Sequence, residues 1–142
     1  MSELPRMTWR TVIALAVSGV ALTAVGSAQP RTGSVFPAGT FLTKISAEDL
    51  SRAGLPVEDA HWERLTFRKD GTWRDVWFHP TVRGQPPARG RYVVTGDELR
   101  LLGTPDLVRW RYSKTELAFT VVHVPDRLAR LIYTVHPWHK TS

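Results

Sequence analysis

The amino-acid sequence predicts an all-β fold, an eight-stranded antiparallel up-and-down barrel with a short helix after the first strand. Three observations lead to this prediction: strand-like runs recur about every ten residues after position 62, turn signals separate them, and apolar and polar side chains alternate within them. The connections are too short for a parallel crossover, which needs about a dozen residues. Eight meandering strands cover their edges best by closing into a barrel. An open sandwich is the alternative.

The expected strands are interrupted by helical structure at one place. Ser46 followed by Asp49 matches a capping box, so a short helix begins there, and Gly54 ends it. Pro56 permits a second helical turn. No further helix is expected beyond it. The strands are expected at 39–45, 62–68, 72–78, 90–95, 98–102, 107–112, 116–122 and 130–136.

The first 28 residues have the pattern of a secretory signal peptide. Arg6 and Arg10 form a basic start, residues 12–25 are mostly apolar, and small residues follow up to Ala28. The apolar run is shorter than the roughly 20 residues that span a bilayer, so cleavage before Gln29 is expected, and an uncleaved anchor is the alternative. The expected organisation is a signal peptide at 1–28, a flexible lead-in at 29–38 and a barrel domain at 39–140, secreted or held in the cell envelope.

Composition and charge narrow the range of functions. The chain has 142 residues, enough for one ordinary domain, and 42% of them are hydrophobic, which is typical of a folded protein. It has no cysteine, which excludes disulfides, thiol nucleophiles and cysteine-based metal sites. The formal charge is +6, which indicates first a solvated charged surface and, as the alternative, a patch that binds an anionic partner.

The turn at 69–71 decides which side chains of the third strand point inward. A three-residue loop with Gly71 in the left-handed conformation puts Phe67 opposite Trp73 and sends Asp75 and Trp77 to the inner face. A two-residue turn would send the alternate set of side chains inward. The first register is preferred because it joins two large aromatic side chains across the strands. An inward Asp75 then needs a partner, water or a ligand, because a buried carboxylate is costly.

Alternation in the other strands completes an aromatic inner wall. In 107–112 one face carries Val108, Trp110 and Tyr112 while arginines occupy the other face. The same reasoning turns Phe119 and Tyr133 inward. A barrel of eight strands has room for its own side chains or for one small ligand. The candidate ligand-binding residues are Phe67, Trp73, Asp75, Trp77, Tyr92, Trp110, Tyr112, Phe119 and Tyr133.

Several segments together resemble a known family. They are Gly39-Thr-Phe41, residues 47–56 (AEDLSRAGLP), residues 65–73 (LTFRKDGTW), residues 90–97 (GRYVVTGD), Val108-Arg-Trp110 and Pro137-Trp138. This order is similar to that of the small secreted lipocalin-like proteins of GC-rich Gram-positive bacteria. The resemblance implies a calycin-type barrel in which the ring of Phe41, at the place of a lipocalin tryptophan, closes the floor. Fold analogy by itself assigns no ligand.

No catalytic or metal-binding constellation is found. The five histidines do not have the spacing of a known zinc site. The acidic pairs are adjacent in sequence, so on a strand they point to opposite faces, and they cannot form a glycosidase pair. No Walker A, G-x-S-x-G, G-x-G-x-x-G or H-E-x-x-H motif occurs. We therefore expect no enzyme, no cofactor and no metal.

Two functions of different class remain. The first is a secreted lipocalin-like binding protein that holds a small apolar or amphipathic molecule inside the barrel, with Asp75 as its polar contact. The second is an envelope-associated module with a packed barrel, whose arginine face binds an anionic envelope polymer or lipid headgroups. An interior cavity of roughly 300 Å³ or more would favour the first. Export argues against nucleic acid, and a monomer is expected. The outer arginines are Arg64, Arg68, Arg89, Arg91, Arg100, Arg109 and Arg111.

Overall fold

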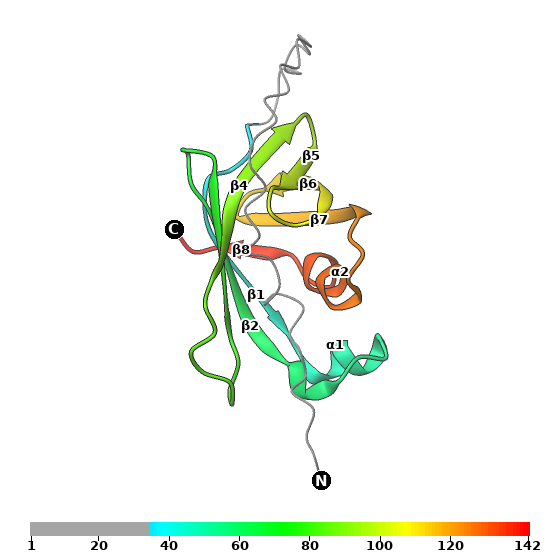
Figure 1. Cartoon of the computed structure of the whole chain (residues 1–142). Helices are drawn as coiled ribbons and strands as arrows, with labels where there is room; N and C mark the ends of the chain where they lie inside the picture. Colours follow the sequence, from blue (N-terminus) through cyan, green and yellow to red (C-terminus); the bar gives the residue numbers. More distant parts are fainter. Residues whose placement is uncertain (1–34) are drawn as a thin grey trace.

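A computed structural model describes residues 35–142, and the expected signal peptide and most of the lead-in lie outside this range. Within it the chain forms a closed barrel of eight antiparallel strands, each paired with its neighbour in chain order (Figure 1). The predicted fold class is therefore confirmed. The strands are β1 (Gly39–Ile45), β2 (His61–Phe67), β3 (Thr72–Phe78), β4 (Ala88–Thr95), β5 (Glu98–Leu101), β6 (Leu107–Ser113), β7 (Glu116–His123) and β8 (Trp138–Lys140).

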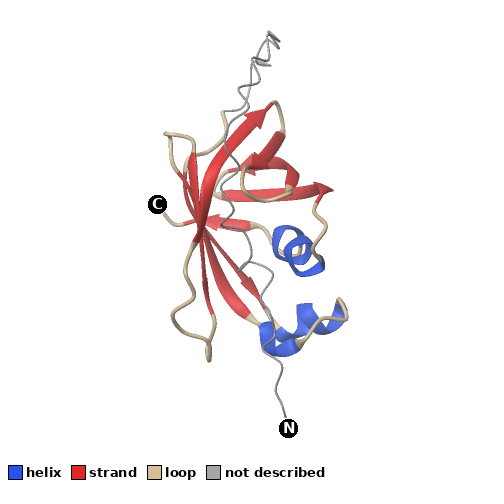
Figure 2. Ribbon diagram, in the orientation of Figure 1, coloured by secondary structure: helices blue, strands red, loops and turns tan. Residues whose placement is uncertain are grey.

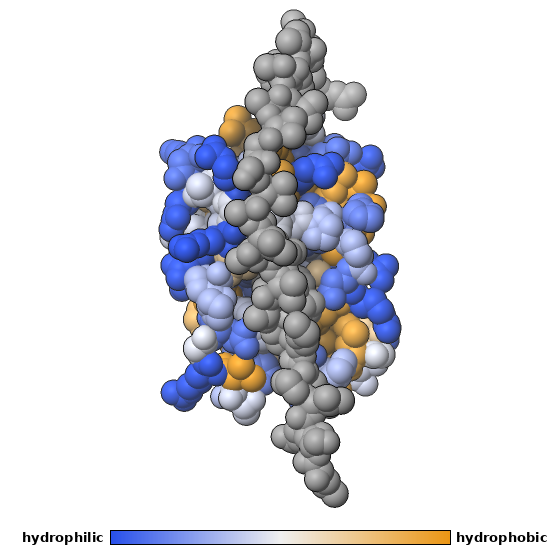
Figure 3. Space-filling view, in the orientation of Figure 1, coloured by the Kyte–Doolittle hydropathy of each residue, from blue (hydrophilic) through white to orange (hydrophobic). Residues whose placement is uncertain are grey.

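Two α-helices accompany the barrel, α1 (Ala47–Arg52) after β1 and α2 (Arg127–Thr134) between β7 and β8. Figure 2 shows both at the same side of the strands, and a hydrogen bond from the Arg127 guanidinium to the Ala53 carbonyl, 2.9 Å long, ties them together. A short 3₁₀ turn, η1 (Val57–Asp59), follows α1 where the second helical turn was expected. The coloured surface in Figure 3 is mostly hydrophilic, with separate apolar patches.

The capping box predicted from Ser46 and Asp49 begins helix α1. The Ser46 hydroxyl accepts a hydrogen bond from the Asp49 amide at 3.1 Å, and the Asp49 carboxylate accepts one from the Ser46 amide at 2.9 Å. These bonds satisfy backbone donors that a helix start otherwise leaves open. Gly54, with φ +67°, lies just past the end of the helix as expected.

The prediction of a strand at 130–136 is wrong, because most of this segment belongs to helix α2. Asp126 caps the helix by accepting a hydrogen bond from the Ala129 amide at 2.8 Å. Ala129, Ile132 and Tyr133 are buried, and this three- and four-residue spacing puts them on one helix face. The alternation of Leu131 with Tyr133 was compatible with a strand, but the capping residue and the helical spacing determine the structure.

The eighth strand is instead β8, which closes the barrel with only three residues. It lies between β1 and β7: Leu42 and Glu116 both pair with His139. Trp138 beside it is 1% exposed. Hydrogen bonds beyond the strand extend the closure, including one of 2.8 Å from the Thr141 amide to the Thr40 carbonyl. The barrel therefore has no long unpaired edge between β1 and β7 at this seam.

The hairpin between β2 and β3 adopts the preferred register. Phe67 lies opposite Trp73, and Gly71 has φ +82°. Trp73 and Asp75 are buried on the inner face, 4% and 5% exposed. Gly90 of β4 lies opposite Trp73, and a side chain there would come within 3.0 Å of the Trp73 indole nitrogen. The absence of a Cβ at this position therefore lets the Trp73 ring pack against β4.

Candidate functional site

Three of the predicted ligand-binding residues surround a ring supplied by the chain itself. Phe36, from the segment before β1, lies with its ring centroid 4.8 Å from that of Phe67, 5.2 Å from that of Trp110 and 5.5 Å from that of Tyr92. We call Phe67, Tyr92 and Trp110 the aromatic cage. The contacts with Phe67 and Trp110 are edge-to-face and the one with Tyr92 is tilted, and edge-to-face contacts at these distances are favourable beyond simple burial. The cage is thus suited to an aromatic or apolar group, and Phe36 occupies it in this structure.

The polar atoms of the cage are held by backbone carbonyl groups. The Tyr92 hydroxyl donates to the Arg68 carbonyl at 2.7 Å, and the Trp110 indole donates to the Gly96 carbonyl at 3.2 Å. Burial, aided by the negative charge of Asp70, raises the pKa of Tyr92, so its hydroxyl stays protonated as a donor. The two polar groups are therefore engaged by backbone carbonyl groups, and the cage presents mainly apolar surface to the Phe36 ring.

The other predicted aromatic residues pack against one another rather than around one space. Tyr112 contacts Phe41, with centroids 6.2 Å apart, and Phe119 contacts Tyr133 at 5.5 Å. Tyr133 reaches this place from helix α2, not from a strand, and its hydroxyl donates to the Asp106 carboxylate at 3.0 Å. These residues form part of the hydrophobic core, as do Phe67, Trp73 and Trp110. The aromatic cage differs from them because a residue outside the strands, Phe36, contacts all three of its rings, so the cage and the inner face of β3 are the candidate interior site.

A buried polar group of side chains lies on the inner face of β2 and β3. His61, Glu63 and Asp75 are 6%, 0% and 5% exposed, and we call them the inner polar patch. The Trp77 ring packs against the imidazole, with centroids 5.4 Å apart. The predicted Asp75 therefore belongs to this patch, the predicted Trp77 packs against it, and neither belongs to the aromatic cage.

The two ring nitrogens of His61 both face acceptor atoms. Nδ1 lies 2.6 Å from the carbonyl oxygen of Asp59, and Nε2 lies 2.9 Å from Glu63 Oε2. A carbonyl oxygen only accepts, so Nδ1 carries a proton. The contact between Nε2 and the Glu63 carboxylate is a second hydrogen bond of the same ring. Because His61 and Glu63 are both buried, this hydrogen bond is shielded from solvent.

Phe36, His61 and Glu63 were not among the predicted site residues. For Glu63 a signal existed: alternation through the strand expected at 62–68 places it on the same face as Leu65 and Phe67. His61 lies two residues before Glu63, just outside that expected strand. Phe36 had no such signal, because the segment around it has the composition of a linker.

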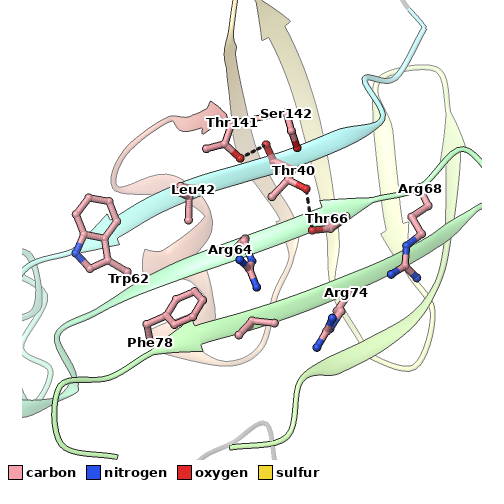
Figure 4. A pocket seen from close by; sticks show the side chains of 11 residues that line it. Thr40, Leu42, Trp62, Arg64, Thr66, Arg68, Arg74, Phe78, Thr141 and Ser142 are labelled. Atoms are coloured by element: carbon pink, nitrogen blue, oxygen red, sulfur yellow. Dashed lines mark hydrogen bonds between the residues drawn. The ribbon is translucent and has the colours of Figure 1, made fainter. Parts of the chain in front are cut away.

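The outer surface of β1, β2 and β3 carries a groove of about 600 Å³ (Figure 4). We call it the outer groove. Trp62 and Phe78 are 49% and 46% exposed there, although both are large and aromatic. Among the residues that the structure describes, no Asp or Glu side chain lines the groove. Its lining residues are Thr40, Leu42, Trp62, Arg64, Thr66, Arg68, Arg74, Val76, Phe78, Thr141 and Ser142.

The arginines at the outer groove differ from those on the opposite part of the barrel. Arg109 of β6 lies 3.9 Å from the carboxylates of both Asp97 and Glu98. Arg64 and Arg74 have no ion pair among residues 35–142.

The part of the chain that the structure describes contains no cluster of three metal-ligating side chains. Over the same residues, neither helix has the length and hydropathy needed to cross a bilayer. The closed eight-stranded barrel is compatible with the lipocalin-like fold that the sequence resemblance implies. Comparison with protein-family models, with curated proteins and with solved structures found no significant match to this chain.

Proposed function

We propose that this chain is an exported, non-enzymatic binding protein that holds a small apolar or amphipathic molecule in the aromatic end of a lipocalin-like barrel. One observation carries the proposal: the ring of Phe36 sits in the aromatic cage. Phe36 precedes β1 and lies outside the strand pairing. Its ring can therefore leave the cage without breaking the barrel, and a ligand of similar shape can take its place.

Asp75 supplies the polar contact for such a ligand. It lies two residues from Trp73 on the inner face of β3, next to Leu65 of the neighbouring strand. Small-molecule sites are typically lined by many apolar side chains and a small number of polar groups, and the polar groups orient the ligand. An amphipathic molecule would place its apolar part in the cage and its polar end toward Asp75.

The test is a pair of matched phenylalanine variants. N-phenyl-1-naphthylamine should bind the protein stoichiometrically and quench tryptophan fluorescence, because Trp110 lies in the cage. Phe36→Ala should tighten this binding, since the competing ring is removed, whereas Phe78→Ala on the outer surface should leave it unchanged. If Phe36→Ala only destabilises the fold and takes up no probe, the interior is a packed core and this function is wrong.

Export is the second part of the proposal and depends on residues 1–28 alone. Cleavage after their small-residue end should give a protein that begins near Gln29. N-terminal sequencing of protein from the culture medium measures this directly. Recovery of the uncleaved chain in the membrane fraction would contradict it.

The arginine face supports a second candidate function, an envelope-associated interaction module. Arg74 of β3 lies directly opposite Arg89 of β4, and like charges in that position are unfavourable without a counterion. Retention on an anionic envelope polymer should then fall steeply between low and physiological salt, because each contact releases bound counterions. No retention at low salt would exclude this function.

A further inference from the structure

The outer groove is divided into an apolar half and a cationic half. Trp62 and Phe78 lie directly opposite each other across β2 and β3, and Figure 4 shows them together at one end of the groove, with Arg68 and Arg74 toward the other. Two residues of a strand span about 6.7 Å along its axis. Arg74, opposite Thr66, is therefore about 13 Å from the aromatic pair along the strands.

The apolar half gathers four apolar side chains from three neighbouring strands. Trp62 and Phe78 are both about half exposed, and Leu42 and Val76 line the groove beside them. Cations lie over both rings, the Arg64 guanidinium carbon 5.1 Å from the Phe78 centroid and the Lys44 ammonium 5.5 Å from that of Trp62. A contiguous apolar surface with a charged rim is typical of a binding site.

The cationic half carries more positive than negative charge. Arg68 and Arg74 line it, and no Asp or Glu side chain lines the groove among residues 35–142. Asp70 of the hairpin accepts hydrogen bonds from the Thr72 hydroxyl and amide at 2.6 and 3.0 Å and interacts electrostatically with Arg68, whereas Arg74 has no ion pair among the same residues. Arginine guanidinium groups bind phosphate, sulfate and carboxylate through paired hydrogen bonds. The arrangement is complementary to an anionic group at this end.

We propose that the outer groove binds one molecule of an anionic amphiphile, a site independent of the barrel interior. Its phosphate, sulfate or carboxylate head lies between Arg68 and Arg74, and its apolar chain runs past Val76 to Trp62 and Phe78. Separation of the two halves favours an amphiphile over a polymer whose charges repeat along its length. A volume of about 600 Å³ fits a single small molecule rather than a membrane surface.

The experiment uses the protein purified from its producing cells. The ligand is dodecyl phosphate, kept below its critical micelle concentration. Calorimetry should give one bound molecule per chain. In nitrogen-resolved NMR spectra the indole signal of Trp62 should shift while that of Trp110 in the aromatic cage stays in place. Dodecanol and inorganic phosphate should each bind at least about tenfold more weakly, because each has only half of the required chemistry.

Variants then locate the two halves of the site. Arg74→Gln and Arg68→Gln should each weaken binding about tenfold, and Trp62→Ala should weaken it while leaving the affinity for inorganic phosphate unchanged. Arg130→Gln is the matched control, because Arg130 is an exposed arginine of α2 outside the groove. All four positions are on the surface or half exposed, so circular dichroism should show unchanged folding.

Three outcomes would overturn this proposal. A shift of Trp110 instead of Trp62 would mean that the amphiphile enters the barrel, which leaves the interior function standing and removes this site. An equal loss in Arg130→Gln would mean unspecific attraction to net charge. Binding to phosphatidylglycerol vesicles without binding to dispersed dodecyl phosphate would mean that the groove face docks on a membrane.

Discussion

The inner and outer faces of strands β2 and β3 carry the same kinds of side chain in opposite surroundings. Inward, Phe67 and Trp73 are almost fully buried and Glu63 and Asp75 are the charged residues. Outward, Trp62 and Phe78 are about half exposed and arginines line the groove. Because successive side chains of a strand point to opposite faces, the acidic side chains lie inside the barrel wall and the arginines lie outside it.

This difference teaches how to distinguish residues that hold the fold from residues available for binding. The inner aromatic side chains are buried in the hydrophobic core together with aliphatic residues of the other strands, so each contributes to stability whether or not it also contacts a ligand. The outer pair contributes little burial, so its aromatic character is not explained by folding. The inner face therefore accounts for stability, and the outer face is the one for which we propose a bound amphiphile.

The largest effect should come from comparing two phenylalanines. Phe67→Ala removes a ring that is 1% exposed and should lower the free energy of unfolding by about 3–5 kcal/mol. Phe78→Ala, at 46% exposure, should cost about 1 kcal/mol or less. Urea unfolding of both variants measures the difference. Similar losses in the two variants would show that the outer aromatic pair belongs to the core after all.

A smaller effect is expected from two neighbouring charged residues. Glu63→Ala leaves His61 Nε2 without its carboxylate partner in a buried place and should cost about 1–3 kcal/mol. Arg64→Ala, on the other face, should change the free energy of unfolding by about 0.5 kcal/mol. Thermal unfolding of both variants at neutral pH tests this. An unaffected Glu63→Ala would mean that water readily replaces the carboxylate.

The same contrast of buried and exposed groups applies to two carboxylates outside the barrel wall. Burial alone would raise the pKa of Asp49, but hydrogen bonds from the Ser46 amide and hydroxyl and from His136 outweigh it and lower the pKa to about 2. Hydrogen bonds from the Thr72 hydroxyl and amide lower the pKa of Asp70. A carboxylate with a lowered pKa stabilises the fold above its unfolded pKa and loses this effect as pH falls.

Asp49→Asn should therefore lower stability by about 1 kcal/mol near neutral pH, and its difference from the unchanged protein should shrink as the pH falls from about 4 to about 2. Asp70→Asn, at an exposed turn, should change the dependence of stability on pH in this acidic range less than Asp49→Asn does. Unfolding curves across this pH range measure both. If Asp49→Asn keeps the original acid profile, its carboxylate does not carry the pH dependence of α1.

Local signals were sufficient to predict most of the fold. Gly71 and the two large aromatics beside it determined the register of β2 and β3, and Ser46 with Asp49 determined the start of α1. The count of eight strands was also correct, but one member was misplaced. Between Asp126 and Thr134 two periodicities overlap, and only the capping of Ala129 together with packing against β7 selects the helix.

The candidate sites were less accessible to prediction because they depend on contacts between distant segments. Phe36 enters the aromatic cage from a stretch whose composition is that of a linker, so nothing near it in sequence indicates burial. The outer groove combines residues of three strands with the last residues of the chain. Alternation assigned Arg64 to the outer face correctly, but it could not show that Trp62 and Phe78 lie side by side there.

The smallest effect concerns the repulsion between Arg74 and Arg89, which lie directly opposite each other. Arg74→Gln should raise the free energy of unfolding by a few tenths of a kcal/mol, about 0.2–1, and added salt should narrow the gain because it screens the same repulsion. Arg100→Gln is the control, since Val93 and Leu107 lie opposite Arg100. A gain in both variants would reflect total charge alone. If only Arg74→Gln is more stable, and it also binds the amphiphile more weakly, then Arg74 lowers the stability of the fold and at the same time contributes to the anion site.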